Sequence, residues 1–355
     1  MKGLILAAGK GTRLRPVTNT IAKPLLPVAN KPILFYVLEQ FKEAGINDIG
    51  IIVSPDTEPS VSGAVGDGSP WGARITCILQ QKPLGLAHAV ITARDFLGDS
   101  PFLMFLGDNL IGESVRGFVS QFNASKPDAL ILLKEVANPS AFGVAETDKD
   151  GKVIRLVEKP KEPKSKLAVV GIYIFTPEIH HAIDRIEPSR RGELEITDAI
   201  QKLIENGKKV SSHLLKQWWL DTGQKADLLE ANRVILGGMA QGERRGTVDA
   251  ASRLTGMVAI GEGTEVEAST IQGPVTIAED CRIRKAAIGP NTSIGRGTVI
   301  EESSVTDSVI LEGCSISHVD CLQDSLIGTR VKIKKGEGAC RAATLFVGCD
   351  ADLVI

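Results

Sequence analysis

Aliphatic residues recur at steps of five or six positions through the C-terminal part of this 355-residue chain. The recurring positions are Ile260, Val266, Ile271, Ile277, Ile283, Ile288, Ile294, Ile300, Val305, Ile310, Ile316, Leu322, Ile327 and Ile333. Every third position completes a longer period of 16 or 17 residues. Three short strands per coil, each with one inward aliphatic residue, are typical of a parallel β-helix of hexapeptide repeats. A β-sandwich is the alternative, but its strands would be longer and would alternate. We therefore expect residues 252–355 to form a left-handed parallel β-helix.

Residues 1–237 show a different pattern, because strand-like and helix-like stretches alternate along them. GLILAA and INDIGIIVS are strand-like, and NKPILFYVLEQFKEAG between them has helical spacing, with Pro32 suited to the first turn. The alternation predicts an α/β domain with a Rossmann-like, mostly parallel sheet and helices on both faces. Ligands of such sheets bind beyond the carboxyl ends of the strands. The glycine- and charge-rich stretch 238–251 is predicted to be a linker.

Composition excludes several classes of protein. The net charge is −2, which gives no bulk attraction to nucleic acid or acidic membranes. No apolar run approaches the roughly 20 residues of a membrane span, and the apolar start is too short for a signal peptide. We therefore expect a cytoplasmic protein with no nucleic-acid or membrane partner. The 6 cysteines form no CxxC pair, which favours reduced packing residues over a zinc site.

A glycine-rich turn follows the first apolar run, in LILAAGKGTRLRP. Glycines after a strand let the backbone approach a phosphate, whose oxygens exposed N–H groups can bind. The turn is not a P-loop, because Gly11 follows Lys10 where Ser or Thr is required. It is not a dinucleotide fingerprint either, because Leu14 stands where the third glycine is required.

Two cations accompany this turn. Arg13 lies within GKGTRLRP, and Lys23 begins KPLLP ten residues later. Arginine binds phosphate oxygens with a rigid fork and lysine supplies a compact charge, so the pair suits a nucleoside triphosphate. Solvated surface residues are the alternative, which the glycine turn makes less favourable.

At this point the chain resembles the sugar-phosphate nucleotidyltransferase family. The resemblance rests on GKGTRLRP and KPLLPVANKP, and it continues through LQQKPLGLAHAV, LGDN, FGVAE, VEKP, VVGIYIF, RGELEITDAI and WWLDTG, in the family's order. It covers nearly all of residues 1–237. LGDN, RGELEITD and WLDTG are most similar to the thymidylyltransferase branch, and the repeat region resembles its long form. The resemblance implies that dTTP and α-D-glucose 1-phosphate, a hexose 1-phosphate, give dTDP-glucose and pyrophosphate.

Two carboxylates are candidate ligands of Mg²⁺. Asp108 ends the strand-like run PFLMFLGD, and Asp221 ends QWWLD. Carboxylates at separate strand ends, together with substrate phosphates, are a usual way to bind this ion. On sequence alone, Asp108 could be a turn residue and Asp221 could cap a helix. The resemblance to the family favours the metal role for both.

The remaining candidates come mainly from the resemblance. Those implied to contact the nucleotide are Leu6, Gly9, Gly11, Thr12, Arg13, Gln80 and Gly85, with Arg13, Lys23 and Asp108 as the catalytic residues. Those implied to contact the sugar phosphate are Gly143, Glu158, Lys159, Val169 and Arg191. A glutamine amide suits the imide edge of thymine or uracil, although Gln81 could take the place of Gln80. We expect His88 to be a helix-surface or packing residue and Trp219 to pack around the site. Pro24 departs from the short thymidylyltransferases, which carry glutamine there.

Several alternatives remain at this stage. The nucleotide could be UTP, or the reaction could be guanylyl transfer to mannose 1-phosphate, since such enzymes also carry a hexapeptide-repeat tail. The β-helix could be an acetyltransferase, but the repeat stretch offers His318 alone as a base. A non-catalytic regulator is disfavoured because the candidate site residues are all present. We expect the β-helix to assemble a homo-oligomer, and its open end to be covered by the final residues AATLFVGCDADLVI.

Overall fold

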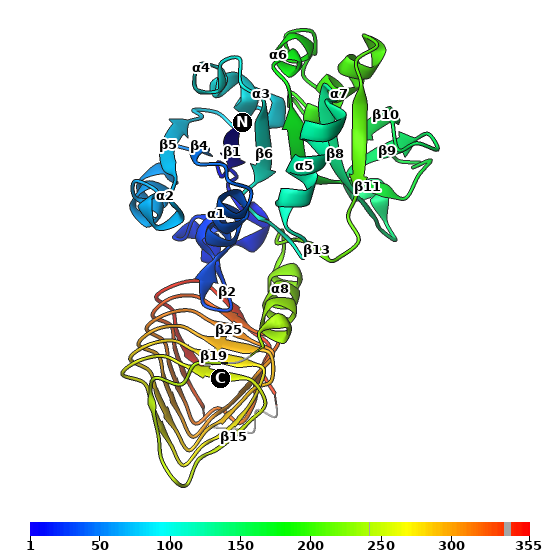
Figure 1. Ribbon diagram of the computed structural model, residues 1–355. Coiled ribbons are helices and arrows are strands. Elements are labelled where there is room, and N and C mark those ends of the chain that lie inside the picture. Colours follow the sequence, from blue (N-terminus) through cyan, green and yellow to red (C-terminus); the bar gives the residue numbers. More distant parts are fainter. Residues whose placement is uncertain (241, 337–341) are drawn as a thin grey trace. The chain divides into compact units, whose positions relative to one another are not determined.

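The computed structural model describes residues 1–240, 242–336 and 342–355. They form two compact units (Figure 1). The first unit comprises Met1–Gly9 and Leu34–Asp221, and the second comprises Lys10–Ile33 and Thr222–Ile355. Among the described residues, no helix is long and apolar enough to cross a membrane. Cys340, one of the cysteines interpreted above as packing residues, lies outside the described ranges.

A nine-stranded sheet organises the first unit. Its strands are β1 (Lys2–Leu6), β4 (Asp48–Val53), β5 (Arg74–Leu79), β6 (Phe102–Leu106), β8 (Ala129–Glu135), β9 (Gly143–Thr147), β10 (Val153–Glu158), β11 (Leu167–Phe175) and β12 (Val210–Leu214). The order is β10-β9-β11-β6-β1-β4-β5, and β8 pairs with both β11 and β12. The short strands β7 (Asn109–Ile111) and β13 (Trp219–Asp221) form a separate antiparallel ribbon.

Seven α-helices accompany this sheet along the described chain (Figure 1). They are α1 (Ile33–Glu43), α2 (Glu58–Val65), α3 (Leu86–Thr92), α4 (Arg94–Leu97), α5 (Val115–Ser125), α6 (Glu178–Ile183) and α7 (Ile196–Glu205). The predicted apolar face of α1 is buried, and Leu34, Leu38 and Phe41 are fully inaccessible. Pro32 precedes this helix and belongs to a short strand instead of its first turn. The stretch LGLAHAVITARDFL forms two short helices, α3 and α4, which meet at Ala93.

The Rossmann-like α/β sheet that the sequence predicts is present, and it is mixed, because antiparallel pairs accompany the parallel ones. The pairs β1–β4, β1–β6, β4–β5 and β8–β12 are parallel, whereas β11 runs antiparallel to β6, β8 and β9. Strands β9 and β10 form a hairpin whose turn is closed by Asp148, which accepts hydrogen bonds from the amides of Asp150 and Lys152. A hairpin leaves no length for a crossover helix, so its strands are antiparallel.

The carboxyl ends of β1 and β6 lie side by side at one edge of the sheet. The two strands are parallel and in register, with Leu6 opposite Leu106. The amide of Gly107 donates a hydrogen bond to the carbonyl of Leu6 over 2.9 Å. The glycine-rich turn after β1 and the Gly107–Asp108 pair after β6 therefore leave the sheet at the same edge, where ligands of such sheets bind.

The second unit contains the expected parallel β-helix, whose coils are visible in Figure 1. Among the described residues, its three sheets contain 7, 6 and 5 strands, and the strand pairs within them are parallel. One sheet is β14 (Thr247–Val248), β17 (Glu265–Glu267), β20 (Arg282–Arg284), β23 (Val299–Glu301), β26 (Ser315–Ser317), β29 (Lys332–Lys334) and β31 (Asp352–Val354). Another is β16 (Val258–Ile260), β19 (Val275–Ile277), β22 (Thr292–Ile294), β25 (Val309–Ile310), β28 (Leu326–Ile327) and β30 (Phe346–Val347). The third is β15 (Arg253–Thr255), β18 (Thr270–Gln272), β21 (Ala287–Ile288), β24 (Ser304–Thr306) and β27 (Leu322–Gln323).

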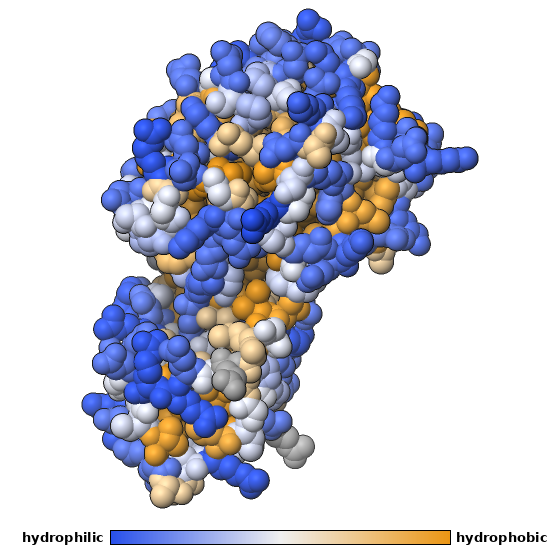
Figure 2. All heavy atoms as spheres, in the orientation of Figure 1, coloured by the Kyte–Doolittle hydropathy of each residue, from blue (hydrophilic) through white to orange (hydrophobic). Residues whose placement is uncertain are grey.

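The periodic aliphatic residues form the core of this β-helix. All of the fourteen predicted positions from Ile260 to Ile333 are at most 1% exposed. The final residues extend the prism from within the same chain, because β30 pairs with β28 and β31 pairs with β29. On the visible face, apolar side chains form patches among the hydrophilic ones of the β-helix (Figure 2).

The second unit also contains the segment Lys10–Ile33, which carries Arg13 and Lys23. This segment has three 3-10 turns and a hairpin of β2 (Pro27–Val28) and β3 (Lys31–Pro32). At the hairpin tip, the side-chain amide of Asn30 donates to the carbonyl of Ile294 over 2.9 Å. The neighbouring amide of Ala29 donates to Asn232, on helix α8 (Lys225–Gly238), over 2.9 Å.

Candidate active site

The glycine-rich turn is built for a tight backbone. Gly11 has φ 59°, in the left-handed region that favours glycine, and it precedes a 3-10 turn over Thr12–Leu14. A Cβ at Gly11 would lie 3.0 Å from a methyl carbon of Thr18 and 3.1 Å from Cβ of Lys23. The hydroxyl of Thr18 donates to the carbonyl of Gly11 over 2.8 Å, which closes the turn. Glycine is therefore required both by conformation and by space.

Arg13 and Lys23 lie in the same unit but in different surroundings. Arg13 is exposed, and its guanidinium lies against Gly223, where a Cβ would come within 2.8 Å of the nearest nitrogen. Lys23 is only 7% exposed and begins the 3-10 turn Lys23–Leu25. Gly223 belongs to the same compact unit as Arg13, and in the sequence it follows Asp221 by two residues. A buried lysine and an open arginine can approach a polyphosphate from different directions.

The short ribbon β7–β13 brings the two candidate metal ligands together. Asp221 is opposite Asn109 in its register, and Asn109 directly follows Asp108. Asp108 comes at the carboxyl end of β6, where the sequence placed it. Among the described residues, no group of three or more His, Cys, Asp or Glu side chains could hold a metal. A site of two carboxylates fits Mg²⁺, which is usually bound by one or two carboxylates completed by water and substrate phosphates.

The sugar-phosphate candidates form one cluster, which we call the acceptor cluster: Gly143, Glu158, Lys159, Val169, Arg191, Glu195 and Thr197. Oε1 of Glu158 is 3.7 Å from Nζ of Lys159 and 3.6 Å from Nη1 of Arg191. The hydroxyl of Thr197 donates to Oε2 of Glu158 over 3.1 Å. A Cβ at Gly143 would be 2.8 Å from a methyl carbon of Thr197, so the backbone approaches closely there.

Two members of the acceptor cluster were not predicted. Glu195 has a side chain only 6% exposed, and its Oε1 is 3.4 Å from Nη1 of Arg191. The hydroxyl of Ser189 also donates to this oxygen, over 2.8 Å. Thr197 is 2% exposed and contacts Glu158 as described above. Both residues lie within RGELEITD, four and six residues after Arg191. This motif was therefore the sequence feature that could have predicted them.

The surroundings of Glu158 disfavour the ionised form of its carboxyl group. Burial raises the pKa of this carboxyl, and the neighbouring charge of Glu195 raises it further, while Lys159, Thr197 and Arg191 act in the opposite direction. The net pKa lies above its ordinary value. Lys159 and Arg191 keep roughly two fifths of their side-chain surface exposed, at 43% each. The cluster therefore contains two accessible cations, Lys159 and Arg191, which are held by contacts with carboxylates.

The candidate base-reading glutamine is buried and has a partner that we did not predict. Gln80 is only 5% exposed, whereas Gln81 is exposed. Of the two, Gln80 is therefore the better candidate for a fixed contact with the base. Nε2 of Gln80 is 2.8 Å from Nδ1 of His88, at the start of α3. His88, expected to be a helix-surface or packing residue, is half-buried, and its ring nitrogen is within hydrogen-bond distance of the amide of Gln80.

Gly85 connects this loop with the RGELEITD stretch. It has φ 106°, and a Cβ there would overlap the backbone of Leu194. The amide of Leu194 donates to the carbonyl of Leu84 over 2.8 Å, and the amide of Ala87 donates to the carbonyl of Leu194 over 3.0 Å. The loop after Gln80 is therefore fixed to the chain next to Glu195, so the base and acceptor candidates share one support.

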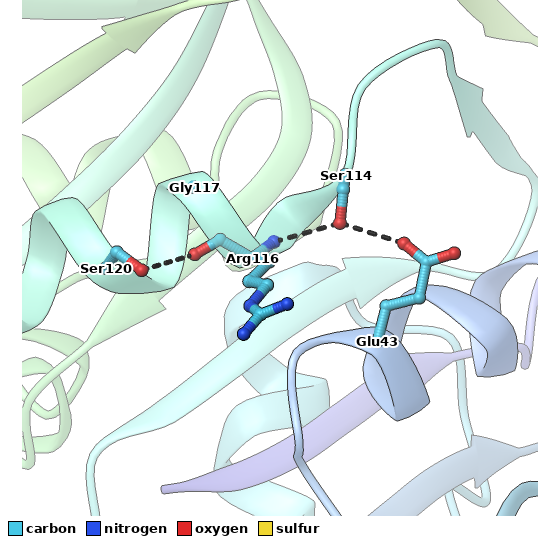
Figure 3. A pocket seen from close by; sticks show the side chains of 5 residues that line it. All are labelled: Glu43, Ser114, Arg116, Gly117 and Ser120. Atoms are coloured by element: carbon cyan, nitrogen blue, oxygen red, sulfur yellow. Dashed lines mark hydrogen bonds between the residues drawn. The ribbon is translucent and has the colours of Figure 1, made fainter.

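An open pocket of about 630 Å³ lies elsewhere in the first unit, at the start of α5 (Figure 3). Its lining contains none of the predicted site residues. The hydroxyl of Ser114 caps the helix by accepting from the amide of Arg116, and it donates to the carboxylate of Glu43 over 2.9 Å. Glu43 already places an anion at this helix terminus, which gives a phosphate no advantage there.

Comparison with known proteins identifies the class. The family model described as nucleotidyl transferase matches residues 2–237, and one described as GMPPB C-terminal domain matches residues 271–345. This chain belongs to the nucleotidyl transferase family, with a hexapeptide-repeat β-helix after the family domain.

Particular relatives resemble the whole chain. A glucose-1-phosphate thymidylyltransferase of Streptomyces griseus is 48% identical over 98% of both chains. The low-salt glycan biosynthesis nucleotidyltransferase Agl11 of Haloferax volcanii is 44% identical over 94% of both chains. A solved structure of a putative glucose-1-phosphate thymidylyltransferase from Bacillus anthracis matches 68% of this chain and 98% of its own, with a TM-score of 0.63 and 37% identity.

Proposed function

We propose that this protein transfers a thymidylyl group from dTTP to α-D-glucose 1-phosphate, giving dTDP-glucose and pyrophosphate. The observation that carries the proposal is the 48% identity, over 98% of both chains, with a relative named for glucose 1-phosphate and thymidylyl transfer. Agreement over nearly the full length includes the β-helix as well as the family domain. The named substrates are therefore the first to test.

The acceptor needs no general base, because its phosphate is already an anion. One phosphate oxygen attacks the α-phosphorus of dTTP, and the bond from that phosphorus to the β-bridging oxygen breaks, so pyrophosphate leaves with the electron pair. Catalysis then depends on alignment and on neutralising charge. We assign alignment of the sugar phosphate to Lys159 and Arg191, the two accessible cations of the acceptor cluster. Arg13 and Lys23 are assigned to the charge of the triphosphate.

The carboxylate of Glu158 is assigned to a sugar hydroxyl. Thr197 and Arg191 hold it from two sides, and an ionised carboxylate accepts hydrogen bonds only. Gly143 and Val169 line the approach, since a Cβ at Gly143 would lie 3.4 Å from Val169. Gln80, in hydrogen-bond contact with His88, is assigned to the base, and Leu6, Gly9, Gly11 and Thr12 are assigned to the nucleotide.

Asp108 and Asp221 are the residues that we assign to Mg²⁺. The ion would supply positive charge at the reacting phosphate. Replacing Asp108 with Asn should leave the fold intact and remove most turnover, because a neutral amide is a poor ligand for Mg²⁺. Pyrophosphate release as a function of magnesium concentration measures this. A variant with unchanged rate and unchanged magnesium dependence would exclude Asp108 from the site.

The substrates are tested by a panel of dTTP, UTP, CTP, GTP and ATP against glucose, galactose and mannose 1-phosphates, scored by pyrophosphate release. We expect dTTP with glucose 1-phosphate to give the highest kcat/KM, UTP to follow, and the remaining nucleotides to be poor. The imide edge of thymine and uracil offers an acceptor and a donor that one amide can match. Preference for GTP with mannose 1-phosphate would instead assign guanylyl transfer.

Acetyl transfer is a second candidate, because a relative named bifunctional protein GlmU, from Methanococcus maripaludis, is 37% identical over 92% of this chain and 77% of its own length. The one repeat-region histidine, His318, is exposed, and its Nδ1 lies 3.0 Å from Oε2 of Glu302. Incubating the protein with acetyl-CoA and the same sugar phosphates tests this activity. We expect no acetylated product, and we propose that the β-helix assembles a homo-oligomer instead.

A further inference from the structure

Asn109 lies between an aromatic donor and the candidate metal ligand. Its Oδ1 accepts a hydrogen bond from Nε1 of Trp219 over 2.5 Å, and its Nδ2 donates to Oδ1 of Asp108 over 2.8 Å. Asn109 is 3% exposed, so water competes little for either bond. We call these three side chains the ribbon relay, because two of them lie on the β7–β13 ribbon.

The orientation of the Asn109 amide is fixed by the chemistry of its two partners. The indole N–H of Trp219 can only donate, and an ionised carboxylate can only accept. A flipped amide would place its NH₂ against the indole N–H and its oxygen against the carboxylate, so both contacts would become repulsive. The ribbon relay therefore has one arrangement in which both bonds form, and in that arrangement the rotation of the Asp108 carboxylate is restrained.

The backbone of the ribbon holds the same groups in place. Asp221 pairs with Asn109 and Trp219 pairs with Ile111, so Trp219 and Asp221 project to one face of β13. The amide of Gly112 donates to the carbonyl of Trp218 over 2.9 Å, which continues the pairing beyond the strand. The same short ribbon therefore positions both candidate ligands. Asp221 belongs to its backbone, and Asp108 is held through the side-chain amide of Asn109.

The indole of Trp219 is itself held by packing. Its ring meets Phe142 edge to face, with centroids 4.9 Å apart and an interplanar angle of 60°. Phe142 directly precedes Gly143 of the acceptor cluster. This packing restrains the indole ring whose N–H contacts Asn109.

We propose that Asn109 and Trp219 are positioning residues that hold Asp108 in the geometry Mg²⁺ requires. This inference rests on the proposed function, in which Asp108 is a metal ligand. Mg²⁺ tolerates little departure from octahedral geometry, and groups that orient its ligands typically change metal affinity by about 10- to 100-fold when removed. Trp219, expected from sequence to be a packing residue, then has a specific task in addition to packing.

Trp219→Phe tests the relay, because it removes the N–H and keeps a ring against Phe142. We expect the Mg²⁺ concentration for half-maximal turnover to rise about 10-fold, with a smaller change in kcat at saturating Mg²⁺. Trp218→Phe is the matched control, since the neighbouring indole is outside the relay, and we expect it to match the unchanged protein. Thermal unfolding of all variants without Mg²⁺ gives the structural effect separately. A lowered melting temperature with unaltered Mg²⁺ dependence in Trp219→Phe would overturn the proposal.

Direct metal binding separates this inference from the proposed function. Mn²⁺ binding to the full-length protein with dTTP, followed by electron paramagnetic resonance, should weaken about 10-fold in Trp219→Phe. If the unchanged protein binds no Mn²⁺, the metal role of Asp108 itself is wrong. If the unchanged protein and Trp219→Phe bind equally well, the relay alone is wrong.

The double variant with Asn109→Ala completes the test. Because Trp219 acts through Asn109, adding Trp219→Phe to Asn109→Ala should change metal binding little further. Effects that multiply in the double variant would show that the two residues act independently, and would overturn the relay.

Discussion

At the scale of single residues, Arg13 is the cation whose removal should cost the most turnover. This residue is exposed, and its guanidinium lies against Gly223 in the same compact unit. Arg13→Ala should lower kcat about 100-fold or more with little loss of stability, because a positioned donor at developing charge is worth several kcal/mol. Pyrophosphate release and thermal unfolding measure the two effects. Arg15→Ala, an exposed neighbour, is the control, and an equal loss there would remove the special role of Arg13.

Glu158 gives a prediction about pH. Its pKa in the folded protein is raised, chiefly by burial and then by Glu195. A raised carboxyl pKa means that stability is fully present below the unfolded-state pKa and is lost as pH rises through the folded-state pKa. Glu158→Gln removes that loss. The free energy of unfolding of the variant, relative to the unchanged protein, should therefore be larger at about pH 7.5 than at about pH 4.5.

Denaturant unfolding at the two pH values measures this difference, with the exposed Glu162→Gln as control. A relative stability that stays constant with pH would contradict the raised pKa. In the same variant, KM for the sugar phosphate should rise, since an amide can present a donor to the hydroxyl where the carboxylate offered acceptors only.

At the scale of elements, the corners of the β-helix form a ladder in which threonine and cysteine alternate. Thr264 donates through its hydroxyl to the carbonyl of Ala278, and Thr298 donates to that of Leu311, over 2.6 Å and 3.2 Å. Cys314 occupies the corresponding position one coil later, and its Sγ lies 3.0 Å from the carbonyl oxygen of Gly328. A small side chain with one donor suits this corner, which explains Cys281 and Cys314 better than packing alone.

Cys314→Thr should therefore be tolerated, with a change of less than about 1 kcal/mol in the free energy of unfolding. Cys314→Leu adds volume to a corner that is 1% exposed and should destabilise by about 1–3 kcal/mol. Denaturant unfolding of the two variants measures both. If threonine costs as much as leucine, the equivalence of the two residue types in the ladder is wrong.

Some features of the strands and loops could be predicted from the sequence, and others could not. Each aliphatic residue from Ile260 to Ile333 could be placed inside, because a period imposed by the coil repeats without interruption. The direction of β11 could not be predicted from the sequence. A buried strand has the same apolar pattern whether its neighbours are parallel or antiparallel to it. Asp108 could be placed at a strand end, but the bond between Gln80 and His88 depends on how a loop meets a helix, which spacing along the chain does not encode.

At the scale of the whole molecule, the β-helix should matter for assembly and for turnover. Cutting the chain near Gly246 removes the proposed assembly surface, together with the carbonyl of Ile294 to which Asn30 donates and the carbonyl of Asn291 to which Asn232 donates. We expect the truncated protein to form a particle of fewer protomers and to turn over more slowly. Sedimentation and pyrophosphate release measure the two effects. An unchanged number of protomers would refute the assembly role.

Asn30→Ala in the full-length chain separates these effects. It removes one support of the hairpin next to Lys23 and leaves the rest of the β-helix in place. We expect turnover to fall while the number of protomers is unchanged. A full rate in this variant would show that the hairpin needs no such support.

The hairpin tip at Ala29 and Asn30 also bears on how such a chain can be recombined with its relatives. The segment 10–33 belongs to the same compact unit as residues 222–355, although about two hundred residues separate them in the sequence. A single genetic crossover near residue 238 would exchange the tail and leave behind the segment that its coils contact. A functional chimaera should instead inherit both pieces from one parent, with junctions near residues 9, 33 and 221. A tail joined to an ancestral family domain would have had to be matched by substitutions near the opposite end of the gene.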